Sequence, residues 1–255
     1  LVARHGYLGP HVVKRGVIFV DIALAQVAAF GVAVALLLGA EVGTDRAWLA
    51  GLASTFVGAL LLSATRTRDP RVPQEAYIGI VYVVFSAAMI LILTQVPHGG
   101  EEIRHLLVGS ILWVTWTEVV KTAGLYAVLG VVLWRAHPSL TLISESPARA
   151  RESGLHLRRW DFLFYLVLGT VVTSSVQIAG VLLVFTLLVV PTVMALRLFP
   201  GGRGQMAWIL VVGLVAVAAG AAASYALDLP TGAVIVCVYG LLLGLQVLVE
   251  TSRRR

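Results

Sequence analysis

The chain of 255 residues carries little charge for its length: 13% of its residues are Asp, Glu, Lys or Arg, whereas 59% are hydrophobic. Soluble globular domains carry about a quarter charged residues, so this composition excludes a water-soluble domain of this size. The mean hydropathy of +0.93 predicts an all-α fold, a polytopic transmembrane helical bundle. We therefore expect a single transmembrane domain over residues 1–255, with no separate catalytic domain.

Motifs for several kinds of chemistry are also missing. The single cysteine, Cys237, excludes an internal disulfide. No GxxxxGK[ST] motif occurs, so the chain does not bind ATP through a Walker motif, and no nucleophile–base pattern indicates an enzyme. The polar start lacks the apolar core of a cleavable signal peptide. Because the chain begins at Leu1 instead of a methionine, we expect a truncated N-terminus.

Long apolar runs predict about eight crossings, since one crossing needs roughly 20 apolar residues. The longest charge-free run, Phe162 to Leu196, exceeds one crossing and predicts a hairpin that turns at Thr173–Ser175 and Gln177. Pro191 predicts a kink in its second arm. The expected spans are Val17–Leu38, Ala47–Ala64, Tyr77–Val96, Leu106–Trp134 (interrupted by charges), Phe162–Thr173, Val176–Leu198, Met206–Ala226 and Thr231–Val249.

The basic residues predict the orientation of these spans, because Lys and Arg concentrate in cytoplasmic loops. With the N-terminal flank in the cytoplasm, alternating spans place sixteen of the 19 Lys and Arg residues on that side. Only Arg46 and Arg104 fall outside, and Lys121 falls within a span. The net charge of +6 is thus an orientation signal that needs no nucleic-acid partner.

Two segments are rich in small residues, which let helices approach closely in lipid. They are Gly213–Ser224 and the pair Gly240 and Gly244. For both segments we expect packing within the chain; the alternative is a contact with a second copy in a dimer.

One long polar connection, Arg135 to Asp161, separates the fourth and fifth predicted spans. Within it, Ser144 or Ser146 can cap a short helix, with Pro147 near its first turn and Gly154 at its end. Such a helix on the cytoplasmic face offers a contact for a soluble partner. The alternative is a solvated basic loop that only follows the positive-inside rule.

Five segments, in this order, carry a resemblance to a known family. They are HVVKRGVIFVDIALAQVAAFG (His11–Gly31), EAYIGIVYVV (Glu75–Val84), HLLVGSIL (His105–Leu112), ISESPARARESGL (Ile143–Leu155) and GVLLVFTLLVVPTVMALRL (Gly180–Leu198). Together they resemble the permease subunit of zinc/manganese-type metal-ion ABC importers. The last segment is the most specific, and the resemblance covers almost the whole chain.

The resemblance implies a transport subunit of the prokaryotic cytoplasmic (inner) membrane that moves a metal ion or metal complex by alternating access. It implies a second permease copy, identical or different, and an extracytoplasmic solute-binding protein. It also implies cytoplasmic ATPase subunits that bind ATP and Mg, so this chain itself needs no cofactor. The polar connection then resembles the coupling helix that contacts the ATPase. Its residues are Ser144, Glu145, Ser146, Pro147, Arg149, Arg151 and Gly154.

The resemblance also marks a transport pathway in the first predicted span. There the family carries an Asp and a His one helical turn apart, at positions occupied here by Ile22 and Gln26. Neither side chain is a usual ligand for zinc or manganese, so we expect no metal ligand in this chain and a neutral constriction around Gln26. Asp21 lies one position away; it either contributes to the pathway or pairs with Lys14 or Arg15 near the cytoplasmic end.

Two further groups of ionisable residues leave alternatives open. Glu118 and Lys121 can meet on one helix face, either as a functional pair in the membrane or as a self-neutralising pair at a helix start. A weak cation-attracting vestibule on the outer side is the second possibility, formed by His98, Glu101, Glu102 and His105.

Two other functions remain open at this point. One is a secondary transporter or channel without ATP, in which Asp21, Glu118 and Lys121 couple ions. The other is a membrane scaffold subunit that transports nothing. Co-purification with an ATPase would separate the importer from both.

Overall fold

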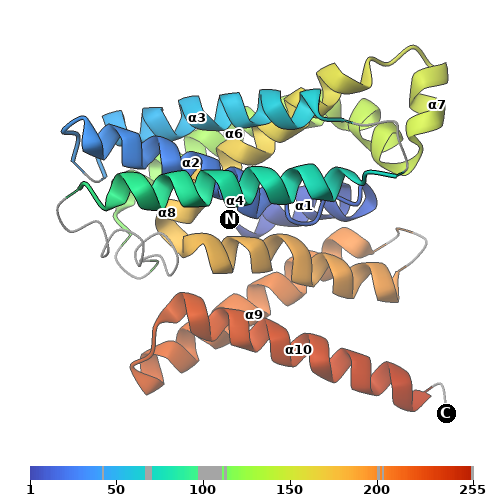
Figure 1. Cartoon of the computed structure of the whole chain (residues 1–255). Coiled ribbons are helices and arrows are strands. Elements are labelled where there is room, and N and C mark those ends of the chain that lie inside the picture. Colours follow the sequence, from blue (N-terminus) through green and yellow to red (C-terminus); the bar gives the residue numbers. More distant parts are fainter. Residues whose placement is uncertain are drawn as a thin grey trace.

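Only helices occur as regular elements in the part of the chain that the computed structural model describes, which is residues 1–41, 43–66, 71–96, 111, 114–199, 202 and 204–253. Figure 1 shows them as a bundle of roughly parallel and antiparallel rods, with the short α7 beyond one end. They are α1 (Val2–Lys14), α2 (Val20–Leu37), α3 (Asp45–Ala64), α4 (Gln74–Leu93), α6 (Trp116–Glu145), α7 (Pro147–Glu152), α8 (Leu157–Leu198), α9 (Gln205–Leu227) and α10 (Thr231–Arg253).

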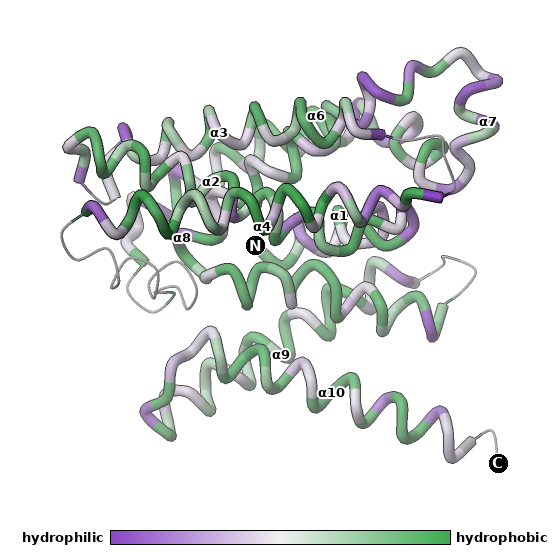
Figure 2. The backbone as a smooth tube through the Cα atoms, in the orientation of Figure 1, coloured by the Kyte–Doolittle hydropathy of each residue, from purple (hydrophilic) through white to green (hydrophobic). Residues whose placement is uncertain are grey.

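Seven of the described helices, α2, α3, α4, α6, α8, α9 and α10, are long and apolar enough to cross a membrane. Figure 2 shows their hydrophobic lengths side by side, with hydrophilic segments gathered near the helix ends and in α7. The predicted polytopic all-α fold is thereby confirmed. The largest boundary error concerns α6, which continues past the predicted end at Trp134 to Glu145. Most of the expected polar connection after Arg135 is therefore helical. The sequence reasoning also missed α1, a helix with Pro10 in its interior.

The longest helix, α8, contains the predicted hairpin. Its 42 residues would extend about 63 Å as one helix, twice the roughly 30 Å of a bilayer core. The backbone breaks at Gly180, where φ is 76° and ψ is 159°. Figure 1 shows the second arm running back beneath the first. The predicted turn at Thr173–Ser175 and Gln177 is wrong, because these residues lie in the helical first arm.

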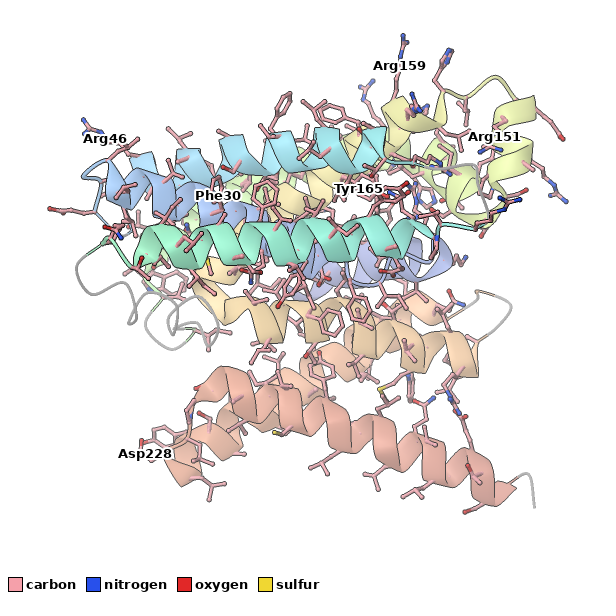
Figure 3. All side chains as sticks on the ribbon, in the orientation of Figure 1. Phe30, Arg46, Arg151, Arg159, Tyr165 and Asp228 are labelled. Carbon is pink, nitrogen blue, oxygen red and sulfur yellow. The ribbon has the colours of Figure 1, made fainter. Side chains whose placement is uncertain are left out.

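The two ends of the bundle carry different charged groups, as the orientation argument predicts. In Figure 3, Arg46 and Asp228 lie at one end, whereas Arg151 and Arg159 lie at the opposite end with α7. We call the end with α7 the cytoplasmic end, after the orientation that the basic residues predict. The chain is thus an integral, multi-pass membrane protein.

The middle of the bundle is built on α2 and the first arm of α8, where small and polar residues meet. A Cβ on Gly31 of α2 would lie 2.4 Å from the carbonyl oxygen of Ala50 in α3, so the two backbones approach as only glycine permits. Thr55 of α3 and Thr173 of α8 join their hydroxyl groups at 2.9 Å. Each hydroxyl oxygen also lies 2.8 Å from the carbonyl oxygen of the residue four positions earlier. Because each hydroxyl carries one hydrogen, one of them donates to its carbonyl and the other donates to its partner hydroxyl, so neither is left unsatisfied in the apolar interior.

The two segments of small residues behave differently. In α9 the expectation of packing within the chain is confirmed, since a Cβ on Gly213 or Gly220 would collide with Val2 or Ile235. In α10 it is wrong, because a Cβ on Gly240 or Gly244 would meet no atom of the described chain within 4 Å. This face of α10 is open in the single chain.

Candidate functional site

The short helix α7 forms for local reasons that the sequence predicts. Ser146 is its N-cap and accepts a hydrogen bond from the backbone N–H of Arg149 at 3.4 Å, and Pro147 occupies the first turn. Gly154 follows the end with φ of 78°, a left-handed conformation that favours glycine. Of the two predicted caps, Ser146 is the correct one.

Helix α7 rests on the bundle through few contacts. Ala150 is fully buried against Ile143 at the end of α6 and Leu157 at the start of α8. Arg149 and Arg151 are exposed on the same short helix. The result is a small basic projection held by one apolar contact, whose role as a coupling helix stays a prediction.

Ser144 and Glu145, which precede α7, contact α1 and the turn that follows it. The Ser144 hydroxyl donates to the carbonyl oxygen of Leu140 at 2.8 Å and accepts from Nε of Arg15 at 2.9 Å. Nδ1 of His11 lies 3.0 Å from the same oxygen. Glu145 forms an exposed ion pair with Lys14 at 3.0 Å. Ser144 is therefore a buried part of the bundle's interior network, and its assignment to the coupling segment stays a prediction.

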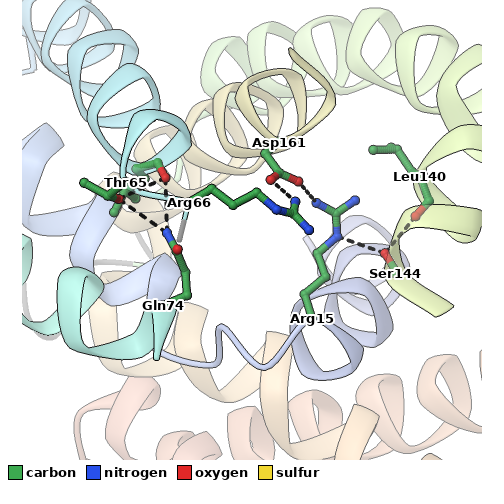
Figure 4. Close-up of polar contacts among 8 residues, drawn as sticks. Arg15, Thr65, Arg66, Gln74, Leu140, Ser144 and Asp161 are labelled. Atoms are coloured by element: carbon green, nitrogen blue, oxygen red, sulfur yellow. Dashed lines mark hydrogen bonds and ion pairs between the residues drawn. The ribbon is translucent and has the colours of Figure 1, made fainter. Parts of the chain in front are cut away.

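Beside Ser144 lies a buried ion cluster that sequence reasoning missed (Figure 4). Oδ1 of Asp161 accepts from Arg15 at 2.8 Å, and its Oδ2 accepts from Arg66. The Asp161 side chain is only 2% exposed, and the Arg15 guanidinium stacks on the Phe164 ring, 4.2 Å from its centroid. One carboxylate thus joins the chain after α1, the chain after α3 and the start of α8.

The sequence assigned Arg66 only to the positive-inside pattern, and it assigned Arg15 to that pattern or to a pair with Asp21. A signal was available, because Asp161 is an acidic residue at a predicted cytoplasmic helix end where basic residues also gather. What the sequence does not contain is the arrangement of helices that brings these three residues together.

The three residues of the predicted pathway lie on the first two turns of α2, but they do not share one environment. Asp21 is 1% and Gln26 7% exposed, whereas Ile22 between them is partly exposed. Both carboxylate oxygens of Asp21 and Oε1 of Gln26 are buried without a hydrogen-bond partner in the described chain. Buried polar atoms without partners are costly in a folded protein, which makes both side chains candidates for a functional role.

The alternative that Asp21 pairs with Lys14 or Arg15 is wrong. Lys14 binds Glu145, and Arg15 binds Asp161 and Ser144. Both cations are therefore paired with residues of α6 and α8 instead of with Asp21.

Glu118 and Lys121 do not form a buried functional pair. Glu118 completes a capping box with Thr115 at the start of α6, accepting from its backbone N–H at 2.7 Å. Lys121 reaches Asp45 of α3 at 3.3 Å, and both side chains are largely exposed. Both residues lie at the start of a helix, as the second alternative expected. They do not neutralise each other through an ion pair, because Glu118 binds Thr115 and Lys121 binds Asp45.

No group of three or more His, Cys, Asp or Glu side chains able to hold a metal ion gathers among the residues whose placement is described. The predicted vestibule of His98, Glu101, Glu102 and His105 lies outside those residues.

Comparison with known proteins agrees with this arrangement. The family model described as "ABC 3 transport family" matches residues 2–250. The chain belongs to this family. It is 26% identical over 242 residues to the "Manganese transport system membrane protein MntC" of Halalkalibacterium halodurans, covering 94% of this chain and 80% of that protein. It is also 26% identical to a "Probable iron transport system membrane protein" of Haemophilus influenzae, over 66% of this chain and 62% of that protein.

Among solved structures, the fold is similar to a chain of "PsaBC from Streptococcus pneumoniae in complex with Fab". The TM-score is 0.78 at 21% identity, with 96% of this chain and 86% of that chain covered. The likeness covers nearly the whole chain and shows that the helical bundle has the fold of that solved protein.

Proposed function

We propose that this chain is the membrane-spanning subunit through which an ABC importer moves a divalent metal ion, or a complex of one, by alternating access. Two cytoplasmic ATPase subunits drive it, and an extracytoplasmic binding protein delivers the cargo. A second permease copy completes the pathway in the cytoplasmic membrane. Manganese and iron are the cargoes named for its relatives.

The observation that carries this proposal is α7: a capped helix, exposed at the basic cytoplasmic end of a bundle whose family transports by ATP. Its apolar contact through Ala150 keeps it on the bundle, while Arg149 and Arg151 face the cytoplasm. A protein partner with an acidic groove complements this surface. ATP hydrolysis therefore belongs to the partner, whose movement reaches the permease through α7.

The pathway in this proposal is neutral at its narrow point. Ile22 and Gln26 offer no carboxylate or imidazole, so the permease discriminates weakly among divalent ions. Selectivity then resides mainly in the binding protein.

The test is uptake by proteoliposomes that contain this permease, its cognate ATPase and its binding protein. Mn²⁺, Fe²⁺ and Zn²⁺ are supplied outside, with ATP on the ATPase side. ATP-dependent accumulation of at least one ion is expected. Uptake driven by an ion gradient without ATP would favour a secondary transporter, and uptake of none of the three would contradict a metal importer.

A substitution at Gln26 tests the neutral constriction. Gln26→Leu removes a buried oxygen that has no partner in the described chain, so the thermal stability of the permease is expected to rise modestly. Metal uptake is expected to fall by roughly tenfold, because an ion that sheds water in a constriction needs polar atoms around it.

The measurement combines the uptake assay with the thermal midpoint of the purified permease. Val27→Leu, at a fully buried neighbour, is the control for altered packing. Unchanged uptake in Gln26→Leu would remove Gln26 from the pathway.

A further inference from the structure

The ion cluster of Asp161, Arg15 and Arg66, whose contacts Figure 4 draws, lies close in sequence or by contact to both chain segments that flank α7. On the N-terminal side, Ser144 precedes the N-cap Ser146 by two residues and binds Arg15. On the C-terminal side, Leu157, which packs under α7, lies one helical turn before Asp161. A displacement of α7 therefore reaches the cluster from both sides.

The cluster is also connected to α3 and α4 through hydrogen bonds. Arg66 lies just beyond the end of α3 and holds the second oxygen of Asp161. Its neighbour Thr65 accepts a hydrogen bond from Gln74, the first residue of α4, at 3.4 Å. Gln74 also donates to the carbonyl oxygen of Leu62 in α3 at 3.2 Å. The cytoplasmic ends of α3 and α4 are thus connected to Asp161 through Arg66 and Thr65.

Charge makes this cluster sensitive to small movements. One carboxylate compensates two guanidinium groups, and Nη2 of Arg15 is buried without a hydrogen-bond partner in the described chain. A buried ion pair is stable only while its geometry is kept, because each charge left uncompensated costs several kcal/mol. A movement that pulls Arg66 from Asp161 therefore costs free energy, which ties the position of Arg66 to that of Asp161.

We propose that Asp161 is a positioning residue that transmits the displacement of α7 to α3 and α4 by holding Arg15 and Arg66 together. The inference rests on the proposed function, since it assigns the step between ATPase movement and the pathway. The ATPase itself still binds the exposed surface of α7. Asp161 determines how much of each ATPase cycle becomes transport.

The decisive variant is Arg66→Gln, because it leaves the neutral Arg15–Asp161 pair intact and removes only the connection to α3. In proteoliposomes with the ATPase and binding protein, stimulated ATP hydrolysis is expected to continue. Mn²⁺ taken up per ATP hydrolysed is expected to fall by roughly tenfold, within the range typical of coupling between sites. The matched control is Lys14→Ala, which breaks the exposed pair with Glu145 at the same end; exposed pairs contribute little, so its ratio stays that of the wild type.

Asp161→Asn is expected to lower the Mn²⁺ taken up per ATP hydrolysed further and to lower stability, because it leaves the buried Arg15 and the partly buried Arg66 without their carboxylate. The double variant Asp161→Asn with Arg66→Gln removes one of these cations and is expected to regain stability, while transport stays uncoupled. A merely structural role predicts instead that uptake and hydrolysis fall together and recover together.

An unchanged ratio in folded Arg66→Gln would overturn the inference and leave the proposed function standing. A wild-type complex that hydrolyses ATP without taking up any metal would overturn both.

Discussion

Replacing Ser146–Gly154 by a flexible Gly-Ser linker of the same length is expected to leave the permease folded in the membrane, while the stimulation of ATP hydrolysis is abolished. The fold survives because α7 meets the bundle mainly through Ala150, a side chain too small to carry much of the core. The function is lost because a flexible linker presents no helix to a partner, and the cost of ordering it, about 1–2 kcal/mol per residue, opposes docking.

The measurement is ATPase activity of the reconstituted complex, with and without the binding protein and Mn²⁺, alongside size-exclusion chromatography of the permease alone. Ser153→Ala serves as the control, since Ser153 is exposed at the end of α7 and its side chain does not cap the helix. Stimulation that persists after replacement would show that the ATPase acts through another surface, and α7 would lose its assigned role.

Local sequence signals were enough to predict most of the membrane helices and α7. Long apolar runs mark the spans because lipid permits no exposed backbone polar groups, and capping residues mark α7 because they satisfy its first N–H groups. The same signals misplaced the end of α6, where the helix continues through Arg135 and Pro138. Polar residues end a span, but they do not end a helix that leaves the membrane.

The candidate site was only partly predictable, since its central contacts join residues far apart in the chain. Arg15 and Asp161 are separated by 146 positions, and no local pattern selects one arginine among many as the partner of a given aspartate. Asp21 shows that closeness in sequence is also a poor guide to ion pairs. Lys14 and Arg15 are the cations nearest to it in sequence, but the packing of α1 against α6 and α8 pairs them with Glu145 and Asp161.

The turn in α8 is a case in which polar residues gave a misleading signal. Thr173 and Ser175 looked like turn residues, but their hydroxyl groups return to carbonyl oxygens four residues earlier in the same helix. They also bind Thr55 of α3 and Tyr126 of α6. In a membrane, Ser and Thr side chains form hydrogen bonds that hold neighbouring helices together. Gly180, without any polar side chain, makes the break.

Substitution of Gly180 is expected to be the most damaging single change in the bundle. Its φ of 76° and ψ of 159° belong to a region that is essentially restricted to glycine, and a side chain there costs roughly 1–3 kcal/mol in backbone strain. The residue is also buried, so the added atoms of Gly180→Val must displace packed neighbours. Because both arms of α8 depend on this reversal, we expect Gly180→Ala to lower the thermal midpoint and Gly180→Val to prevent recovery of monodisperse protein.

The matched control is Gly124→Ala in α6, where a Cβ would meet no described atom within 4 Å. There the substitution is expected to be neutral or to stabilise by roughly 0.5–1 kcal/mol, as alanine does in a helix interior. Thermal midpoints of the detergent-solubilised variants, followed by fluorescence-detected size-exclusion chromatography, separate the two outcomes. If Gly180→Val elutes and melts like the wild type, the chain can reverse without the glycine conformation.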